Sequence, residues 1–242
     1  MSTAFEYDNL SLRPAGPFLT ALSWALPGVR EVRAQTVPYA AYWREANAAA
    51  LEQQGPLWVA LGDSMTQGIG ASAPDRGYVG QLRDHLAAAG RPHRLVNLAV
   101  TGARVHDLVV HQLPALEALV ARGEVPDLLT VVIGSNDVVA PRNRAGLAER
   151  FEAMLDRLPR GAVVANLPNP QSEARRVCAV LRDRAARGDL VVADIRAHGP
   201  RSWRGRLAAD KFHPNDAGYA GMAHVFDVAL GLPAGPPEAR SP

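Results

Sequence analysis

Short apolar runs alternate with amphipathic segments along the chain from Leu57 onward. Five of the runs are rich in Val, Leu and Ile and lack polar alternation, which is typical of strands that are covered on both faces. They are LWVAL (57–61), RLVNLAV (94–100), DLLTVVIG (127–134), AVVANL (162–167) and LVVADI (190–195). Between them, apolar residues recur at helical spacing, as at Val79, Leu82 and Leu86. This alternation predicts an α/β fold with a mostly parallel sheet and helices on both of its faces.

The pattern changes at both ends of this region and so predicts three parts of the chain. Residues 1–54 lack the strand–helix alternation, but their Ala-rich second half predicts a helix that ends at Gly55 and Pro56. We expect an N-terminal extension over 1–54, mostly helical, one α/β domain over 55–232, and a flexible Pro- and Gly-rich tail over 233–242. Whether the extension covers a sheet edge or a functional site stays open.

Charge and cysteine content narrow the classes of function. The 242 residues include 26 Lys and Arg against 24 Asp and Glu, a net charge of +2 without a basic block, so we expect no nucleic-acid partner. The single cysteine cannot form an intrachain disulfide, which fits a cytoplasmic location and leaves secretion open. The apolar stretch Pro17–Val29 is too short to span a bilayer and contains Pro27. We therefore expect no stable membrane insertion, with an interfacial anchor as the alternative.

Chemistry-bearing residues follow the predicted strands. Ser64 follows the first strand, Gly102 the second and Asn136 the third, while Asp210 and His213 lie beyond the fifth. Taken singly, each has an ordinary explanation, because serine caps helices and glycine and asparagine are common in turns. Taken together, they belong to one edge of the sheet, because the carboxyl ends of parallel strands meet there. The sequence therefore predicts a functional site at this edge.

Acyl transfer needs this set of chemical groups. A serine hydroxyl becomes nucleophilic when a base takes its proton, and His213 can act as that base for Ser64, with Asp210 fixing the imidazole tautomer. The oxyanion that forms needs donors already in place. The candidate donors are the N–H groups of Ser64 and Gly102 and the side-chain amide of Asn136.

Four further polar residues are interpreted as structural. Asp63 and Asp137 each stand beside a candidate catalytic residue, and we interpret them as turn or supporting residues that hold the two loops. His85 and His93 flank the end of a predicted helix and are interpreted as solvated. Neither an H-x-x-x-H pattern nor a paired carboxylate cluster occurs, so we expect no metal ion.

Four sequence blocks carry the candidate residues and resemble those of the SGNH hydrolases, also called GDSL-like esterases and lipases. The blocks are GDSMTQG (62–68), NLAVTGAR (97–104), GSND (134–137) and DKFHPN (210–215), and the resemblance covers residues 57–232. Met65 stands where many members carry leucine, which is a volume-conserving exchange. The resemblance implies a flavodoxin-like three-layer α/β/α sandwich and a reaction that uses no metal or organic cofactor.

The same resemblance implies an activity and assigns roles. Ser64, His213 and Asp210 correspond to the family's triad, and Ser64, Gly102 and Asn136 to its oxyanion hole. The implied protein is a serine esterase that hydrolyses carboxylic esters of short to medium acyl chains, with a small-molecule ester as its partner. A carbohydrate O-acetyl esterase, a lysophospholipase and a thioesterase are the enzymatic alternatives, and a non-catalytic binding domain is the alternative outside enzymes. Acyl preference, alcohol moiety and oligomeric state are not predicted.

Overall fold

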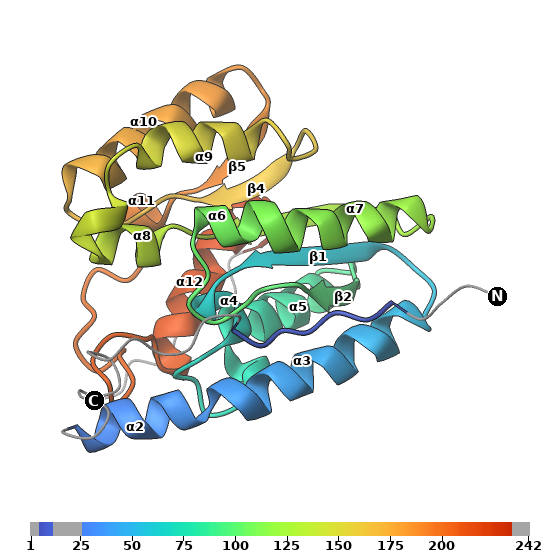
Figure 1. Ribbon diagram of the computed structural model, residues 1–242. Coiled ribbons are helices and arrows are strands. Elements are labelled where there is room, and N and C mark those ends of the chain that lie inside the picture. Colours follow the sequence, from blue (N-terminus) through green and yellow to red (C-terminus); the bar gives the residue numbers. More distant parts are fainter. Residues whose placement is uncertain (1–4, 12–25, 234–242) are drawn as a thin grey trace.

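A five-stranded sheet forms the centre of the computed structural model, which describes residues 5–11 and 26–233 (Figure 1). Its strands are β1 (Leu57–Gly62), β2 (Arg94–Asn97), β3 (Leu128–Val132), β4 (Ala162–Ala165) and β5 (Leu190–Ala193). Their spatial order is β2-β1-β3-β4-β5, and every neighbouring pair is parallel. This is the flavodoxin-like strand order. The α/β fold and the five strands predicted from the apolar runs are confirmed.

The two faces of the sheet bury different residues of the same strand. Along β1, Leu57, Val59 and Leu61 join one apolar core, while Trp58 and Ala60 join the other. Successive side chains of a strand point to opposite faces, so a run without polar alternation supplies apolar groups to both. All residues of β1 are buried, which explains why this run contains no polar position.

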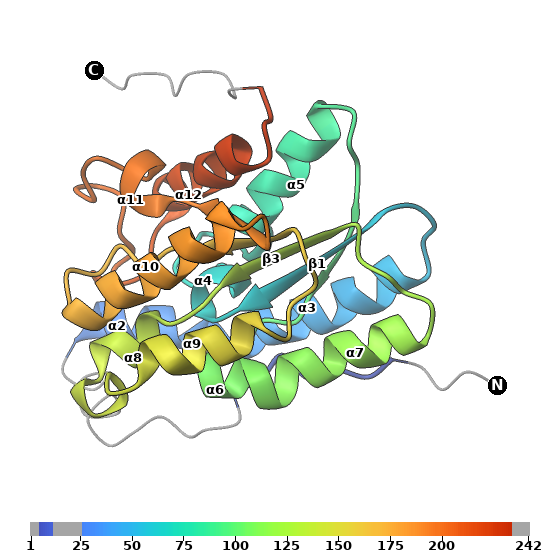
Figure 2. The same ribbon diagram turned by 90° about the horizontal axis from the view of Figure 1, so that it is seen from above.

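Helices cover both faces and complete the three layers (Figures 1 and 2). One face carries α7 (Leu113–Ala121), α9 (Leu147–Leu155) and α10 (Ser172–Ala186), and the other carries α5 (Tyr78–Ala88) and α12 (Asp216–Ala229). The shorter elements are α4 (Ser64–Gln67), α6 (Val105–Asp107), α8 (Ser135–Val139), α11 (Ile195–His198), η1 (Pro74–Arg76), η2 (Leu108–Gln112) and η3 (Pro141–Asn143). Val79, Leu82 and Leu86, which repeat at helical spacing in the sequence, lie buried on α5.

The described part of the N-terminal region consists of residues 5–11, which are extended, and the helices α2 (Pro27–Ala34) and α3 (Thr36–Leu51). Helix α3 packs against the edge strand β2. Trp43 on α3 is 1% exposed and donates its indole N–H to the carbonyl oxygen of Gln67 at 2.9 Å. This contact joins the N-terminal region to α4, which begins at the end of β1.

Several sequence expectations fall on parts of the chain outside the described residues. These are residues 1–4 and 12–25 of the predicted extension, most of the apolar stretch Pro17–Val29, and residues 234–242 of the predicted tail. Among the helices that are described, none combines the length and the apolar character needed to cross a bilayer.

Strand β2 ends earlier than its apolar run. The strand stops at Asn97, whose side-chain Oδ1 accepts the N–H of Ala99 at 2.9 Å and so draws the backbone into a local turn. The N–H of Val100 still donates to the carbonyl oxygen of Gly62 at 3.2 Å. The chain therefore leaves regular strand geometry at Asn97 but stays beside β1, and it carries Gly102 to the carboxyl edge of the sheet.

Candidate active site

The turn between β1 and α4 presents Ser64 at the carboxyl edge of the sheet. Gly62 ends the strand, and a Cβ placed on it would lie 2.4 Å from the carbonyl oxygen of Val132, so a side chain does not fit there. Asp63 caps α4, because its Oδ1 accepts the N–H of Met65 at 3.0 Å. Ser64 is thus the first residue of the helix, with 4% of its surface exposed.

Ser64, His213 and Asp210 form a continuous chain of hydrogen bonds. His213 Nε2 lies 2.9 Å from Ser64 Oγ, and His213 Nδ1 lies 2.6 Å from Asp210 Oδ2. The second oxygen of Asp210 accepts the N–H groups of Phe212 and His213, each at 3.0 Å. Lys211, between Asp210 and Phe212, adopts the left-handed conformation (φ 57°), which closes this short turn. The arrangement allows the imidazole to accept the serine proton while the carboxylate fixes its other nitrogen.

Opposing effects set the charge of Asp210. Burial raises the pKa of its carboxyl, but the hydrogen bond and the charge of His213, together with the two backbone N–H groups, outweigh burial and lower the pKa below its ordinary value. Asp210 is therefore ionised at neutral pH. An ionised carboxylate at this position stabilises the imidazolium that forms when His213 takes a proton.

Gly102 and Asn136, the two candidate oxyanion donors from other loops, follow β2 and β3, the two strands that flank β1 in the sheet. Gly102 is exposed and has φ of 78°, the left-handed region that favours glycine. Asn136 lies on α8 and donates from Nδ2 to Ala103 O at 3.0 Å and to Asp63 Oδ2 at 3.3 Å. A carboxamide has two N–H donors, so both are engaged. A bound oxyanion would replace Asp63 Oδ2 as the acceptor of the longer of these two hydrogen bonds.

Asp63 is the most deeply buried titratable group beside the nucleophile. It is 1% exposed, and burial raises its pKa to about 7, although the N–H of Met65 and the charge of His213 act in the opposite direction. The nearby charge of Asp137 raises this pKa further. Because Asp63 accepts the amide of Asn136, its carboxyl links the nucleophile turn to the loop that follows β3.

Side chains from two helical elements hold the backbone of the site loops. Asp137 Oδ2 accepts the N–H of Val105 at 3.1 Å; burial raises the pKa of Asp137 despite this bond and the charge of Arg150. Gln112, at the end of the π-helical turn η2, accepts the N–H of Gly62 and donates to its carbonyl oxygen, both at 2.8 Å. Sequence analysis did not single out Gln112, because its partner is a backbone group fifty positions away.

An apolar pocket, here called the Met65 pocket, adjoins the nucleophile turn and the loop after β3. Its empty space is about 370 Å³. It is lined by Met65, Val132, Ile133, Ser135, Ala165, Asn166, Leu167, Pro168, Ile195, Trp203 and Met222. Two of these residues are chain neighbours of Ser64 and Asn136, so the pocket adjoins the candidate nucleophile and a candidate oxyanion donor.

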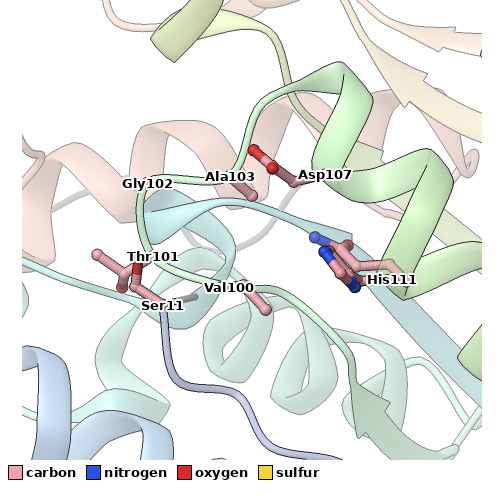
Figure 3. Close-up of a pocket in the computed structure, with 8 residues that line it drawn as sticks. Ser11, Val100, Thr101, Gly102, Ala103, Asp107 and His111 are labelled. Carbon is pink, nitrogen blue, oxygen red and sulfur yellow. The ribbon is translucent and has the colours of Figure 1, made fainter. Parts of the chain in front are cut away.

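A second hollow, here called the Gly102 pocket, lies at the loop that follows β2 (Figure 3). Its empty space is about 270 Å³. It is lined by Ser11, Val100, Thr101, Gly102, Ala103, Asp107, His111 and Gln112. Figure 3 shows Ser11 beside Thr101, with Asp107 and His111 across the hollow on the helical side. This pocket is more polar than the Met65 pocket in its side chains.

Within residues 5–11 and 26–233, no three His, Cys, Asp or Glu side chains gather in a way that could hold a metal ion.

Comparison with known proteins identifies the class to which this fold and site belong. The sequence model of the GDSL-like Lipase/Acylhydrolase family matches residues 60–220, which is more than half of the chain, and the chain belongs to this family. The family resemblance of the four blocks is thereby confirmed. The comparison with curated protein sequences found no match.

Solved structures with the same fold include several esterases and lipases. TesA has 22% sequence identity and a TM-score of 0.55, over 72% of this chain and 97% of its own. A variant of the acetyl xylan esterase Axe2 from Geobacillus stearothermophilus has 23% identity and a TM-score of 0.54, over 74% and 96%. The lipase Lip_vut3 from a goat rumen metagenome has 19% identity and a TM-score of 0.56, over 72% and 97%. At these identities the likeness establishes the three-layer α/β/α fold.

Proposed function

We propose that the protein is a serine esterase that hydrolyses carboxylic esters of short to medium acyl chains. The observation that carries the proposal is the hydrogen-bonded chain from Ser64 Oγ through His213 to Asp210, with contacts of 2.9 Å and 2.6 Å. This geometry makes the serine a nucleophile, and membership of a family of lipases and acylhydrolases supports ester hydrolysis as the reaction.

The reaction proceeds in two halves. Ser64 Oγ attacks the ester carbonyl while His213 Nε2 takes the hydroxyl proton, and the N–H groups of Ser64 and Gly102 with the amide of Asn136 stabilise the oxyanion. The tetrahedral intermediate collapses, and His213 returns the proton to the departing alkoxide, which leaves as the alcohol. Water then enters, His213 takes its proton, and the hydroxide attacks the acyl-enzyme to release the acid and regenerate Ser64.

The linings of the two pockets suit different parts of an ester, the acyl chain and the alcohol moiety. The Met65 pocket is lined mostly by apolar side chains, which suits the acyl chain of an ester. The Gly102 pocket carries Thr101, Asp107 and His111 and suits a polar alcohol moiety.

A carbohydrate O-acetyl esterase is the second candidate. The polar lining of the Gly102 pocket favours it, since a sugar hydroxyl needs hydrogen-bond partners that an apolar wall does not offer. Acetyl xylan esterases are also among the proteins that share the fold. Release of acetate from acetylated xylan, compared with hydrolysis of p-nitrophenyl acetate, butyrate and octanoate, separates the two candidates; an acyl-CoA thioester tests the thioesterase alternative.

The decisive test is labelling with a fluorophosphonate followed by intact-mass analysis, together with ester turnover. We expect one adduct on the wild-type chain and none on Ser64→Ala, whose turnover falls by about 10⁶-fold. Ser72→Ala is the matched control: Ser72 lies in the loop after α4, and its hydroxyl donates to Asp216 Oδ2 at 2.6 Å. This control should keep both the adduct and the activity. Turnover retained by Ser64→Ala would disprove the mechanism, and neither adduct nor turnover in the wild type would favour a non-catalytic binding domain.

A further inference from the structure

Four buried carboxamide side chains form one hydrogen-bonded group, here called the amide cluster. Its members are Asn9, Asn47, Gln67 and Asn97, which are 0%, 3%, 0% and 0% exposed. They come from the extended segment 5–11, from α3, from the end of α4 and from the end of β2. A buried carboxamide is costly unless its donors and acceptors are satisfied, so such a cluster fixes its neighbours in position.

Asn9 directs its polar atoms at the chain just after β2. Its Nδ2 donates to Asn97 O at 2.8 Å and to Ala99 O at 2.9 Å. Its Oδ1 accepts from Asn47 at 3.3 Å, and its backbone oxygen accepts from Gln67 Nε2 at 2.8 Å. Asn9 therefore binds the carbonyl oxygen of the last residue of β2 and that of Ala99, two residues beyond it.

Two other contacts hold the same stretch from the N-terminal side. Tyr7 donates its hydroxyl to Leu98 O at 2.7 Å. Asn47 donates to Asn97 O at 2.8 Å and accepts the N–H of Asn97 at 2.7 Å. Together with Asn9, these side chains occupy the carbonyl oxygens of three consecutive residues, 97–99. They take the place that a further strand would have beside an edge strand.

The cluster also connects this stretch to the helix that begins at Ser64. Gln67 ends α4 and donates to Ala99 O at 3.0 Å, and its Oε1 accepts the hydroxyl of Thr101. Asn97 Nδ2 donates to Thr66 O at 2.8 Å. The segment 97–101 is thus fixed relative to α4, and the next residue is Gly102, a candidate oxyanion donor.

The extended segment itself leads to Gly102. A Cβ placed on Gly102 would lie 3.9 Å from Ser11 Oγ, and Ser11 lines the Gly102 pocket beside Thr101 (Figure 3). Asn9 and Asn47 lie outside residues 60–220, where the family's sequence model matches. The support of this loop is therefore supplied by the part of the chain that the sequence marks as an extension.

We infer that Asn9 is a positioning residue for the Gly102 N–H, and that segment 5–11 with α3 belongs to the catalytic unit. The inference rests on the proposed function, because it gives a role to the oxyanion donor. Asn9 acts through the carbonyl oxygens of Asn97 and Ala99 and does not touch the reacting atoms. Its loss should displace the donor and weaken binding of the transition state more than binding of the substrate.

The test is Asn9→Asp in the full chain. This isosteric change replaces two N–H donors with an oxygen that faces Asn97 O and Ala99 O, so the contacts become repulsive. We expect kcat and kcat/KM for p-nitrophenyl acetate to fall together by about 10- to 100-fold with KM almost unchanged, which is the signature of an interaction made in the transition state. Deuterium uptake over residues 97–104 should rise. Glu6→Gln, an exposed position on the same segment, is the control and should change neither quantity.

Other results of this experiment would overturn the inference about Asn9 or the proposed function. A folded Asn9→Asp with wild-type kcat, or with unchanged deuterium uptake over 97–104, would overturn the inference. Asn9→Ser, measured below its own melting temperature, repeats the test without an added charge; if neither variant folds, Asn9 is a requirement of the fold and not a positioning residue. If the wild type shows no Ser64-dependent turnover, the proposed function fails, while the deuterium uptake still decides whether Asn9 orders the loop.

Discussion

Within residues 5–11 and 26–233, two histidine–aspartate pairs have the same atoms in contact. His213 Nδ1 lies 2.6 Å from Asp210 Oδ2 in the candidate active site. His85 Nδ1 lies 2.9 Å from Asp227 Oδ2 and joins α5 to α12 on one face of the sheet. The pairs differ at the other imidazole nitrogen: His213 Nε2 meets the hydroxyl of Ser64 at 2.9 Å, whereas among the described residues the ring of His85 hydrogen-bonds to Asp227 alone.

The carboxyl groups of the two pairs also differ in the direction of their pKa shifts, and the backbone explains why. Asp210 stands in a turn, where the N–H groups of two following residues point at its Oδ1, and its pKa is lowered. Asp227 lies within α12, where backbone N–H groups already bond to carbonyls of the preceding turn. Burial therefore raises the pKa of Asp227 more than the hydrogen bond of His85 and the charges of His85 and His224 lower it.

The comparison separates structural pairing from catalytic geometry. An imidazole and a carboxylate in contact can tie two helices together, as His85 and Asp227 do. The pair becomes a candidate for catalysis when a nucleophile lies at the other imidazole nitrogen and the pKa of the carboxyl is lowered, as at Ser64 and Asp210.

Removal of each histidine gives the largest expected difference between the pairs. His213→Ala should reduce kcat for p-nitrophenyl acetate by about 10⁶-fold, because the serine loses its base. His85→Ala should leave kcat within about twofold of the wild type, since away from functional features a substitution changes stability and not the reaction. A folded His85→Ala with a loss of several orders of magnitude would remove the distinction between the two pairs.

Removal of each carboxylate charge gives the next largest difference. Asp210→Asn keeps the shape of the side chain but favours the wrong imidazole tautomer, and we expect kcat to fall by about 10⁴-fold. Asp227→Asn should leave the steady-state parameters of ester hydrolysis unchanged. Comparable activity of the two variants would show that the charge of Asp210 is not used in the reaction.

The features that depend on a short stretch of sequence were predictable from the sequence. The five apolar runs match the five strands apart from differences at their ends, because burial on both faces leaves a continuous apolar pattern in the sequence. The residues of the Ser64–His213–Asp210 chain stand in short blocks directly after the strands or in one turn, so their meeting follows from the parallel sheet. The apolar pattern did not reveal where β2 ends, since Asn97 ends the strand through its side chain.

The features that depend on contacts between distant polar residues were not predictable. His85, interpreted as solvated, has a side chain that is 37% exposed, but the interpretation missed its pairing with Asp227, 142 positions away. Asn9 and Asn47 are single polar residues whose partners include backbone carbonyl oxygens, and no sequence pattern marks a carbonyl as needing a donor. Such contacts become visible only when the fold has brought the segments together.

The smallest expected difference between the two pairs is in the pH dependence of stability, and its sign is opposite for the two carboxylates. Since the pKa of Asp227 is raised in the fold, the native state holds that proton more tightly than the unfolded chain, and the free energy of unfolding falls as the pH rises from about 4. Since the pKa of Asp210 is lowered, its contribution is present above about pH 4 and is lost as the pH falls through the folded pKa.

Melting temperatures between pH 3 and pH 8 test these opposite signs. Asp227→Asn should flatten the decline of the melting temperature above pH 4, and Asp210→Asn should flatten the decline below it, each by a few degrees, since a chain of this size changes by about 2–4 °C per kcal/mol. If both substitutions flattened the same side of the profile, the pKa values of Asp210 and Asp227 would be shifted in the same direction. That result would contradict the argument that backbone N–H groups, available in the turn and already used in the helix, decide the direction of the two pKa shifts.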